Sequence, residues 1–180
     1  MDEYAKLIEE AGADRAGLRK LRDLTDPVVL EVLNYWYAQR GQRRMPAPPD
    51  IDPVVIARHM PHLMMLQVDY EPFDLSYRLI GEKVAHSHGK NFKGQSVLAI
   101  NNQKPKLGSM LFELFKAVAM LRRPVGVGGQ MEFAGGGYMD FEAAYMPLSF
   151  GGERTDRIFT VTVYREVPVA ERFKSELTSI

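Results

Sequence analysis

The four histidines of this chain are its side chains best suited to metal chemistry, and they fall in two pairs. His86 and His88 form an H-x-H pattern, and His59 and His62 form H-x-x-H upstream, split by Pro61. Two histidines two residues apart hold a metal ion only on an extended backbone with a third ligand, and no suitably spaced acidic residue is adjacent. We therefore predict no metal site and expect loop histidines that hydrogen-bond to the backbone near Gly89.

Paired carboxylates are the second group that could do chemistry. Asp140 and Glu142 share one face of a predicted strand, and Glu132 is expected to oppose them across a hairpin. Such pairs can do acid–base work, but on an antiparallel edge they usually form a solvated face. The chain has no cysteine, no G-x-S-x-G motif and no serine near a histidine and a carboxylate in a recognisable order. We therefore predict no catalytic residue and no enzyme activity.

Arg78 is the candidate for binding a charged ligand. It lies between Tyr77 and Leu79 in the run SYRLIG, so strand alternation points its side chain away from the face that those two share. Arg78 faces solvent if the sheet is covered on one side. If both sides are covered, it is partly buried and must meet an anion, either a carboxylate or an acidic ligand.

Two helices are predicted from capping residues and apolar spacing. Asp26 or Thr25 can cap a helix that begins at Pro27 and ends at Gly41. The strongest amphipathic pattern runs from residue 104 to residue 123. Residues 1–24 are expected to form a short helix and a loose connection, Asp52 to cap a short helix ending at Pro61, and residues 82–100 to contain short helical pieces.

Strand patterns predict the rest of the fold. Five segments qualify: residues 63–68, 73–81, 125–133, 138–148 and 157–165. Short turns make neighbouring strands antiparallel. In the second segment Phe73, Leu75, Tyr77 and Leu79 are expected on one face, and in the third Gly126, Gly128 and Gly129 indicate a bulge or a close backbone approach. The order predicts an α+β fold, a five-stranded antiparallel sheet with helices on one face, preceded by N-terminal helices.

Length and charge limit the class of protein. The chain has 180 residues, enough for one domain, with 23 basic and 23 acidic residues, so no overall field attracts nucleic acid. No apolar run approaches the roughly 20 residues that span a bilayer, and the N-terminus is charged throughout. We expect a cytoplasmic protein with an N-terminal helical part and proline-rich link (1–50), a main domain (51–168) and a polar tail (169–180).

Six short stretches give the sequence a family resemblance: YWYAQRG, MPAPPDIDP, MPHLMMLQVD, YRLIGEKV, HGKNFKGQ and YMPLSFGGERTDRI. Together with the order of elements, they resemble a bacterial group of single-domain PAS proteins over Val28 to Val163. The resemblance implies a sheet whose inner face and helices enclose a pocket. PAS domains sense small molecules, light or redox state, or dock proteins. This sequence carries no kinase, cyclase or DNA-binding module, so a signal would leave through a protein partner.

The resemblance also implies where a ligand and a second copy would bind. The pocket candidates are Arg78, Phe92, Leu98, Leu114, Met131, Phe133, Phe141 and Tyr145, with core packing as the alternative for the apolar ones. Helices before a PAS domain often form dimer contacts, which implies a homodimer through Val29, Leu33, Trp36 and Arg40. Packing of this helix against its own sheet is the alternative.

Within the PAS resemblance, the residues that this chain lacks narrow the choice of cofactor. A cysteine adduct with flavin and a cysteine-anchored chromophore are both excluded, and residues 104–123 offer no axial histidine for haem. Noncovalent flavin and a small apolar or acidic metabolite stay open.

Three functions remain in view. The first is a PAS-type sensor or adaptor that binds a small ligand, a protein partner or both in bacterial signal transduction. The second is a ligand-free protein-interaction module. The third is a small cone-fold enzyme of the hydratase or isomerase type, but that fold begins with its long helices, whereas here the longest helix is in the middle.

Overall fold

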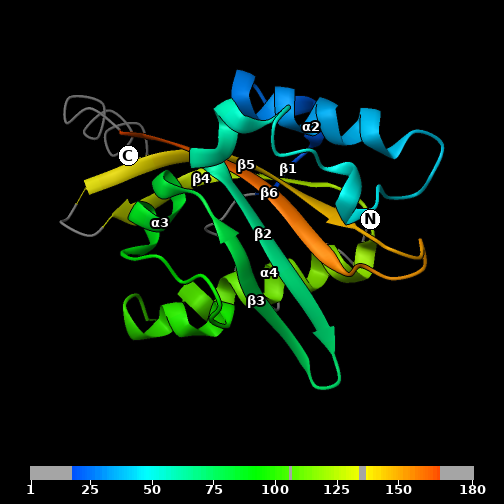
Figure 1. Ribbon diagram of the computed structural model, residues 1–180. Helices are drawn as coiled ribbons and strands as arrows, with labels where there is room; N and C mark the ends of the chain where they lie inside the picture. Colours follow the sequence, from blue (N-terminus) through cyan, green and yellow to red (C-terminus); the bar gives the residue numbers. More distant parts are fainter. Residues whose placement is uncertain (1–17, 106, 134–136, 167–180) are drawn as a thin grey trace.

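A computed structural model describes residues 18–105, 107–133 and 137–166 (Figure 1). The elements are, in chain order, β1 (Leu18–Arg19), η2 (Leu21–Asp23), α2 (Pro27–Arg40), η3 (Pro48–Asp50), η4 (Ala57–His62), β2 (Leu63–Tyr70), β3 (Phe73–Ile80), α3 (Glu82–His88), η5 (Val97–Asn102), α4 (Leu107–Leu121), β4 (Val125–Phe133), β5 (Gly137–Leu148) and β6 (Arg157–Glu166).

The strands form one antiparallel sheet in the order β1-β4-β5-β6-β2-β3. The five predicted strands and their antiparallel pairing are therefore confirmed. The sixth, β1, pairs Leu18 with Val127 and Arg19 with Gly126 at the sheet edge. This part of residues 1–24 was expected to be helix or loose connection, and only the short η2 is helical here; residues 1–17 and the predicted tail 169–180 lie outside the described residues.

One face of the sheet, called the inner face below, is covered by α3, η5 and α4 (Figure 1). The predicted long helix is confirmed as α4, and the predicted short helical pieces are confirmed as α3 and η5. Buried residues of this core include Leu66, Leu75 and Tyr77 from the strands and Leu114 and Phe115 from α4. The helices predicted to pack on one face of the sheet form this layer.

The opposite face, called the outer face below, is covered by α2 (Figure 1). The predicted helix begins at Pro27 and ends before Gly41, as its capping residues indicate. Its buried stripe, which includes Trp36, packs with Met146 of β5 and Phe159 of β6. Trp36 also donates a hydrogen bond from Nε1 to the carbonyl of Pro147, 3.1 Å away. The helix before the PAS-like region therefore shares a core with the sheet.

Polar contacts fix the first turn of α2 on β5 and β6. Asp26 caps the helix by accepting hydrogen bonds from the backbone N–H groups of Val28 (2.8 Å) and Val29 (3.2 Å). Its other carboxylate oxygen pairs with Arg165 of β6. Glu142 of β5 accepts a hydrogen bond from the backbone N–H of Asp26 at 2.6 Å. Since the Asp26 carboxylate is buried, its two N–H donors and Arg165 are what make its charge tolerable there.

The expected helix between Pro53 and Pro61 differs in the structure. The segment is a turn followed by the 3₁₀-helix η4, which contains Pro61. Asp52 accepts a hydrogen bond from the N–H of Val54 at 2.8 Å, as expected of a cap. So few residues between two prolines cannot repay the cost of nucleating an α-helix.

A bulge changes the facing of β3. Met65 pairs with Leu79 and Leu66 pairs with Tyr77, so Arg78 has no partner in the β2–β3 register. Tyr77 packs in the inner core, whereas Leu79 packs against the outer one. The prediction that these two share a face is therefore wrong at Leu79, because one extra residue reverses the alternation.

The glycine-rich start of β4 pairs with β1 at the edge of the sheet. A Cβ atom on Gly126 would lie 2.9 Å from the backbone oxygen of Arg19, and one on Gly128 would lie 3.1 Å from the Arg19 side chain. The predicted close backbone approach is thus confirmed at Gly126, whereas at Gly128 the close neighbour is a side chain.

The contacts at Asp26 generate a prediction about stability. We expect Asp26→Ala to lower the free energy of unfolding by about 1–3 kcal/mol, because it removes the helix cap and leaves Arg165 without its partner. Asp23→Ala is the control, since Asp23 and its partner Arg22 are exposed and should contribute less than about 0.5 kcal/mol. Urea unfolding measures both. Equal losses in the two variants would contradict the assigned role of Asp26.

Candidate functional site

The inner face of β6 carries hydroxyl groups where a core strand usually has apolar side chains. Thr160 and Thr162 alternate with Phe159 and Val161, which pack on the outer face. In a sheet covered on one side, this alternation would place the threonines in water. Here they are 0% and 2% exposed, because α3, η5 and α4 cover the inner face.

Three tyrosines extend this polar surface across the sheet. Tyr77 of β3 is fully buried, and its ring centroid lies 6.1 Å from that of His88. Burial raises the pKa of Tyr77 far above its usual range, and the nearby Tyr164 and Tyr145 hydroxyls raise it further. On the sheet, Tyr145 is directly opposite Thr160 in the β5–β6 register.

Helix α3, which covers the inner face, adds the polar side chains of Ser87 and His88. Ser87 donates from Oγ to the carbonyl of Val84 at 2.8 Å, and its backbone carbonyl accepts from Nζ of Lys104 at 2.6 Å. Burial raises the pKa of Tyr164 to about 12, against a smaller opposing effect of its hydrogen bond with Ser87. Burial also lowers the pKa of His88 to about 4, with a further contribution from Lys104.

These residues form what we call the inner polar cluster: Tyr77, Ser87, His88, Tyr145, Thr160, Thr162 and Tyr164. Within the described part of the chain, four of its buried polar atoms have no hydrogen-bond partner. They are Tyr77 Oη, His88 Nδ1, Thr160 Oγ1 and Thr162 Oγ1. Buried polar groups nearly always have a partner, and each one left without costs about 1–3 kcal/mol. Three of these atoms lie on strands of the sheet, and the fourth, on His88, lies on α3, which covers the inner face.

The predicted pocket residues divide into three groups. Phe92, Leu114 and Tyr145 are buried in the inner core, and Phe141 packs against it. Leu98 is 42% exposed, because the 3₁₀ turn of η5 directs its neighbours Val97 and Ile100 inward instead. The side chain of Leu98 therefore does not lie in the inner core, where a pocket residue would be.

Met131 and Phe133 lie in β4, but their side chains fall outside the described residues, so their pocket role stays a prediction. Arg78 is exposed at the β3 bulge and is not part of the inner polar cluster. The alternatives for Arg78 were exposure to solvent and partial burial beside an anion, and the structure shows exposure. Its contact with an acidic ligand stays a prediction.

The predicted dimer residues of α2 face their own sheet. Val29, Leu33 and Trp36 are buried in the outer core, which is the alternative of packing within one chain. Arg40 is half-buried, and its guanidinium lies 5.4 Å from the centroid of the Tyr37 ring. A homodimer stays a prediction, and contacts between copies would have to use the opposite side of the helix.

The histidines are placed differently from expectation. His86 and His88 lie in the last turn of α3 and not in a loop, with His86 exposed and His88 buried. His62 contacts the backbone carbonyl of Thr162 through Nδ1 at 3.2 Å, and His59 contacts the carboxylate of Glu31 through Nε2 at 2.9 Å. Among the described residues, no three histidine or acidic side chains gather as a metal-binding group.

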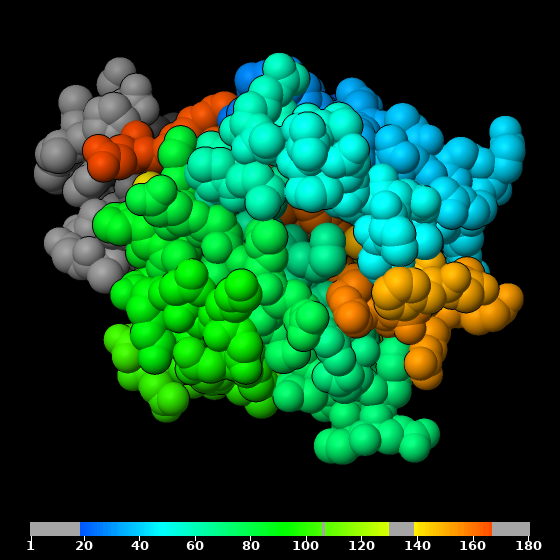
Figure 2. All heavy atoms as spheres, in the orientation of Figure 1, coloured from blue at the N-terminus to red at the C-terminus, as the bar shows by residue number. Residues whose placement is uncertain are grey.

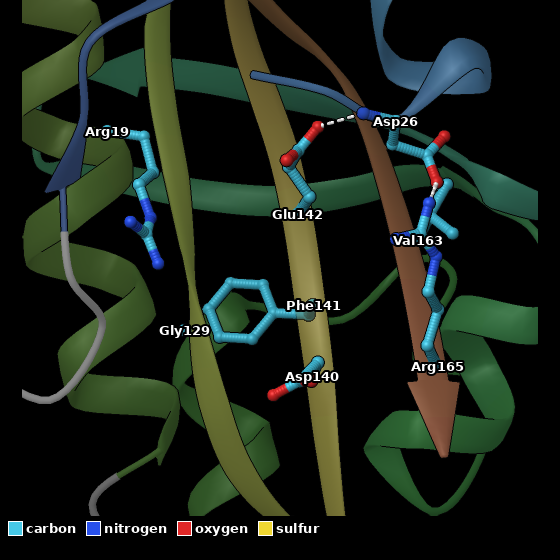
Figure 3. Close-up of a pocket in the computed structure, with 8 residues that line it drawn as sticks. All are labelled: Arg19, Asp26, Gly129, Asp140, Phe141, Glu142, Val163 and Arg165. Atoms are coloured by element: carbon cyan, nitrogen blue, oxygen red, sulfur yellow. Dashed lines mark hydrogen bonds and ion pairs between the residues drawn. The ribbon is translucent and has the colours of Figure 1, made fainter. Parts of the chain in front are cut away.

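Of the three predicted carboxylates, Glu132 does not join the other two. Glu132 is opposite Tyr138 and Asp140 is opposite Gln130, so Glu132 does not oppose Asp140 and Glu142 as expected. Glu142 instead holds the start of α2. It lines a cavity of about 310 Å³ with Arg19, Asp26, Gly129, Asp140, Phe141, Val163 and Arg165 (Figure 3). Figure 3 shows Asp26 already joined to Arg165 and Glu142, so these groups stabilise the fold.

Sequence reasoning missed most of the inner polar cluster. The signal was present in FTVTVYR, where Thr160, Thr162 and Tyr164 occupy every second position. A polar residue at every second position is read as a solvent face unless both faces of the sheet are known to be covered. The predicted pocket residues are accordingly mostly apolar.

Two comparisons bear on the class of the protein. A family model described as a PAS domain matches residues 24–163, which include α2, the first four predicted strands, most of the fifth and the helices between them. A comparison with curated proteins gives no match. Of the helices in the described ranges, none combines the length and the apolar character needed to cross a membrane.

The unpartnered hydroxyl of Thr160 generates a prediction. We expect Thr160→Val to leave the free energy of unfolding of the ligand-free protein unchanged or to raise it, because the variant removes a buried group without a partner. Thr155→Val is the matched control: Thr155 is equally buried, but its Oγ1 donates to the carbonyl of Ala119 at 2.9 Å. It should lose about 1–3 kcal/mol in urea unfolding. A comparable loss in Thr160→Val would show that its hydroxyl has a partner.

His88 generates a prediction about pH. Its pKa falls from 6.5 to about 4 on burial, so the unfolded chain binds the proton more readily than the folded one. Stability should therefore decrease as the pH falls from about 6.5 to about 4, by about 3 kcal/mol for this group. His62, whose pKa burial also lowers, acts in the same direction.

The measurement is urea unfolding at pH 7 and pH 4.5. His88→Asn should reduce the difference between the two values, and His86→Asn, at an exposed position of the same helix turn, should retain it. The same pH dependence in both variants would contradict the buried, neutral state of His88.

Proposed function

The chain belongs to the PAS domain family of sensory and interaction modules, and on that premise we propose that it is a sensor that binds a small molecule at the inner polar cluster. The observation that carries the proposal is the set of four buried polar atoms without partners. A molecule that hydrogen-bonds to them would stabilise the folded state, since each bond removes a cost that the ligand-free protein carries.

Binding without catalysis is part of the proposal. Burial raises the pKa of Tyr164 to about 12 and lowers that of His88 to about 4. A general acid or base works best when its pKa lies near the working pH. These two groups would therefore keep one protonation state near neutrality, which favours recognition over proton transfer and speaks against the hydratase or isomerase alternative.

Signal output through a protein partner completes the proposal, in bacterial cytoplasmic signalling and with a homodimer as the expected form. The supporting feature is the route from the cluster to the outer layer. On β6, Tyr164 belongs to the cluster and the next residue, Arg165, pairs with Asp26 at the start of α2. Neighbouring residues of one strand thus contact both layers.

The second candidate is a ligand-free interaction module, and one surface favours it. A mainly apolar groove of about 370 Å³ lies between α2 and residues 55–59, and it is lined by residues that include Tyr35, Ala38 and Ile56. Val54, beside it, is 81% exposed. In Figure 2 the chain from about residue 43 to residue 62, cyan to teal, covers the upper part of the face shown. Exposed apolar side chains beside a groove are typical of docking surfaces.

Native mass spectrometry of the freshly purified protein separates the two candidates. We expect a mass surplus that is lost on denaturation, and we expect the double variant Tyr77→Phe, Thr160→Val to retain much less of it while keeping a cooperative unfolding transition. A bare chain in the wild type would reject the sensor proposal and leave the interaction module. A surplus unaffected by the double variant would place the ligand elsewhere.

A further inference from the structure

The inner polar cluster contains polar groups but no described carboxylate. Its members are hydroxyls and one imidazole, and no acidic group influences the pKa of Tyr77, His88 or Tyr164. A cation bound there would be buried without a countercharge, which is costly in a low-dielectric interior. The described part of the cluster therefore disfavours a positively charged ligand.

The cluster is also poorly suited to a negatively charged ligand. Among the described residues, Lys104 is the cation that contributes to the lowered pKa of His88, and its Nζ donates to the carbonyl of Ser87 at 2.6 Å. This bond lies near the C-terminal end of α3, where a cation also interacts favourably with the helix carbonyls. An anionic ligand would have to share the Lys104 ammonium group with that carbonyl.

Aromatic rings border the cluster. Tyr77 and Phe92 have ring centroids 6.4 Å apart, as do Phe141 and Tyr164, and Phe115 lies 5.1 Å from Tyr145 in an edge-on arrangement. Such rings favour offset or edge contacts with another aromatic ring. Hydroxyl groups, in turn, can both donate and accept hydrogen bonds.

We propose that the inner polar cluster selects an uncharged aromatic molecule that carries both a hydrogen-bond donor and an acceptor. The inference rests on the proposed sensor function and specifies the ligand class. The rings around Tyr77 and Tyr164 hold the planar part of the ligand. The unpartnered atoms on Tyr77, His88, Thr160 and Thr162 bind its polar edge. The ligand is small, because these atoms are enclosed in the structure.

Four matched probes test the class: benzamide, benzoate, benzylamine and cyclohexanecarboxamide. Benzamide is neutral and aromatic with a donor and an acceptor; the next two change its charge, and the last removes its aromatic ring. We expect benzamide to bind the wild-type protein most tightly, as measured by NMR titration at pH 7. Tyr77→Phe should weaken its binding about tenfold through the lost hydrogen bond.

Tyr70→Phe is the control variant, because the Tyr70 hydroxyl already donates to the carbonyl of Thr155 at 2.9 Å and is not part of the cluster. It should bind benzamide as the wild type does. Equal weakening in both tyrosine variants, or none in Tyr77→Phe, would overturn the assignment to the cluster. Tighter binding of benzoate or benzylamine would overturn the neutral class, and equal binding of cyclohexanecarboxamide would overturn the aromatic one.

The class and the sensor function can fail separately. If none of the four probes binds while native mass spectrometry shows a retained molecule that the double variant loses, the inferred class is wrong and the sensor function stands. If no probe binds and the chain is bare, both are rejected.

Discussion

The fold depends on a sheet that must be covered on both faces. In β6 every residue from Ile158 to Val163 is buried, so neither face of this strand tolerates water. Helices α3 and α4 with η5 cover one face and α2 covers the other. Neighbouring residues on each strand point to opposite faces, so each layer covers apolar side chains of both β5 and β6. Removing either layer would therefore expose apolar side chains of both strands.

The two layers are joined by the same pair of strands. Glu142 and Arg165 hold the start of α2 on the outer face, while their neighbours Phe141 and Tyr164 lie on the inner face. The arrangement places the charged contacts on the outer face, where Arg165 stays exposed to solvent, and the uncharged hydroxyls on the inner face. The sheet therefore separates a structural ionic site on one face from the neutral polar groups of the proposed recognition site on the other.

The covered inner face explains why the candidate site is both polar and buried from solvent. Threonine side chains suit strands by shape, because their branched Cβ packs well on a pleated surface. Their hydroxyls cannot reach water once the helices are in place, and the β-ladder already uses the backbone groups around them. Thr155 solves the same problem by donating to a helix carbonyl, whereas Thr160 and Thr162 have no such acceptor within the described residues.

Local sequence signals determined the elements. Asp26 and Pro27 set the start of α2, alternating residues set the strands, and short turns made them antiparallel, because these effects act between residues close in the chain. Tertiary structure alone decided the bulge at Arg78, which turned Leu79 to the other face, and the pairing of β1 with β4. It also decided the site. Whether Thr160 and Thr162 meet water or a ligand depends on α2 covering one face and α3 and α4 the other, and burial is a property of distant segments that no local pattern contains.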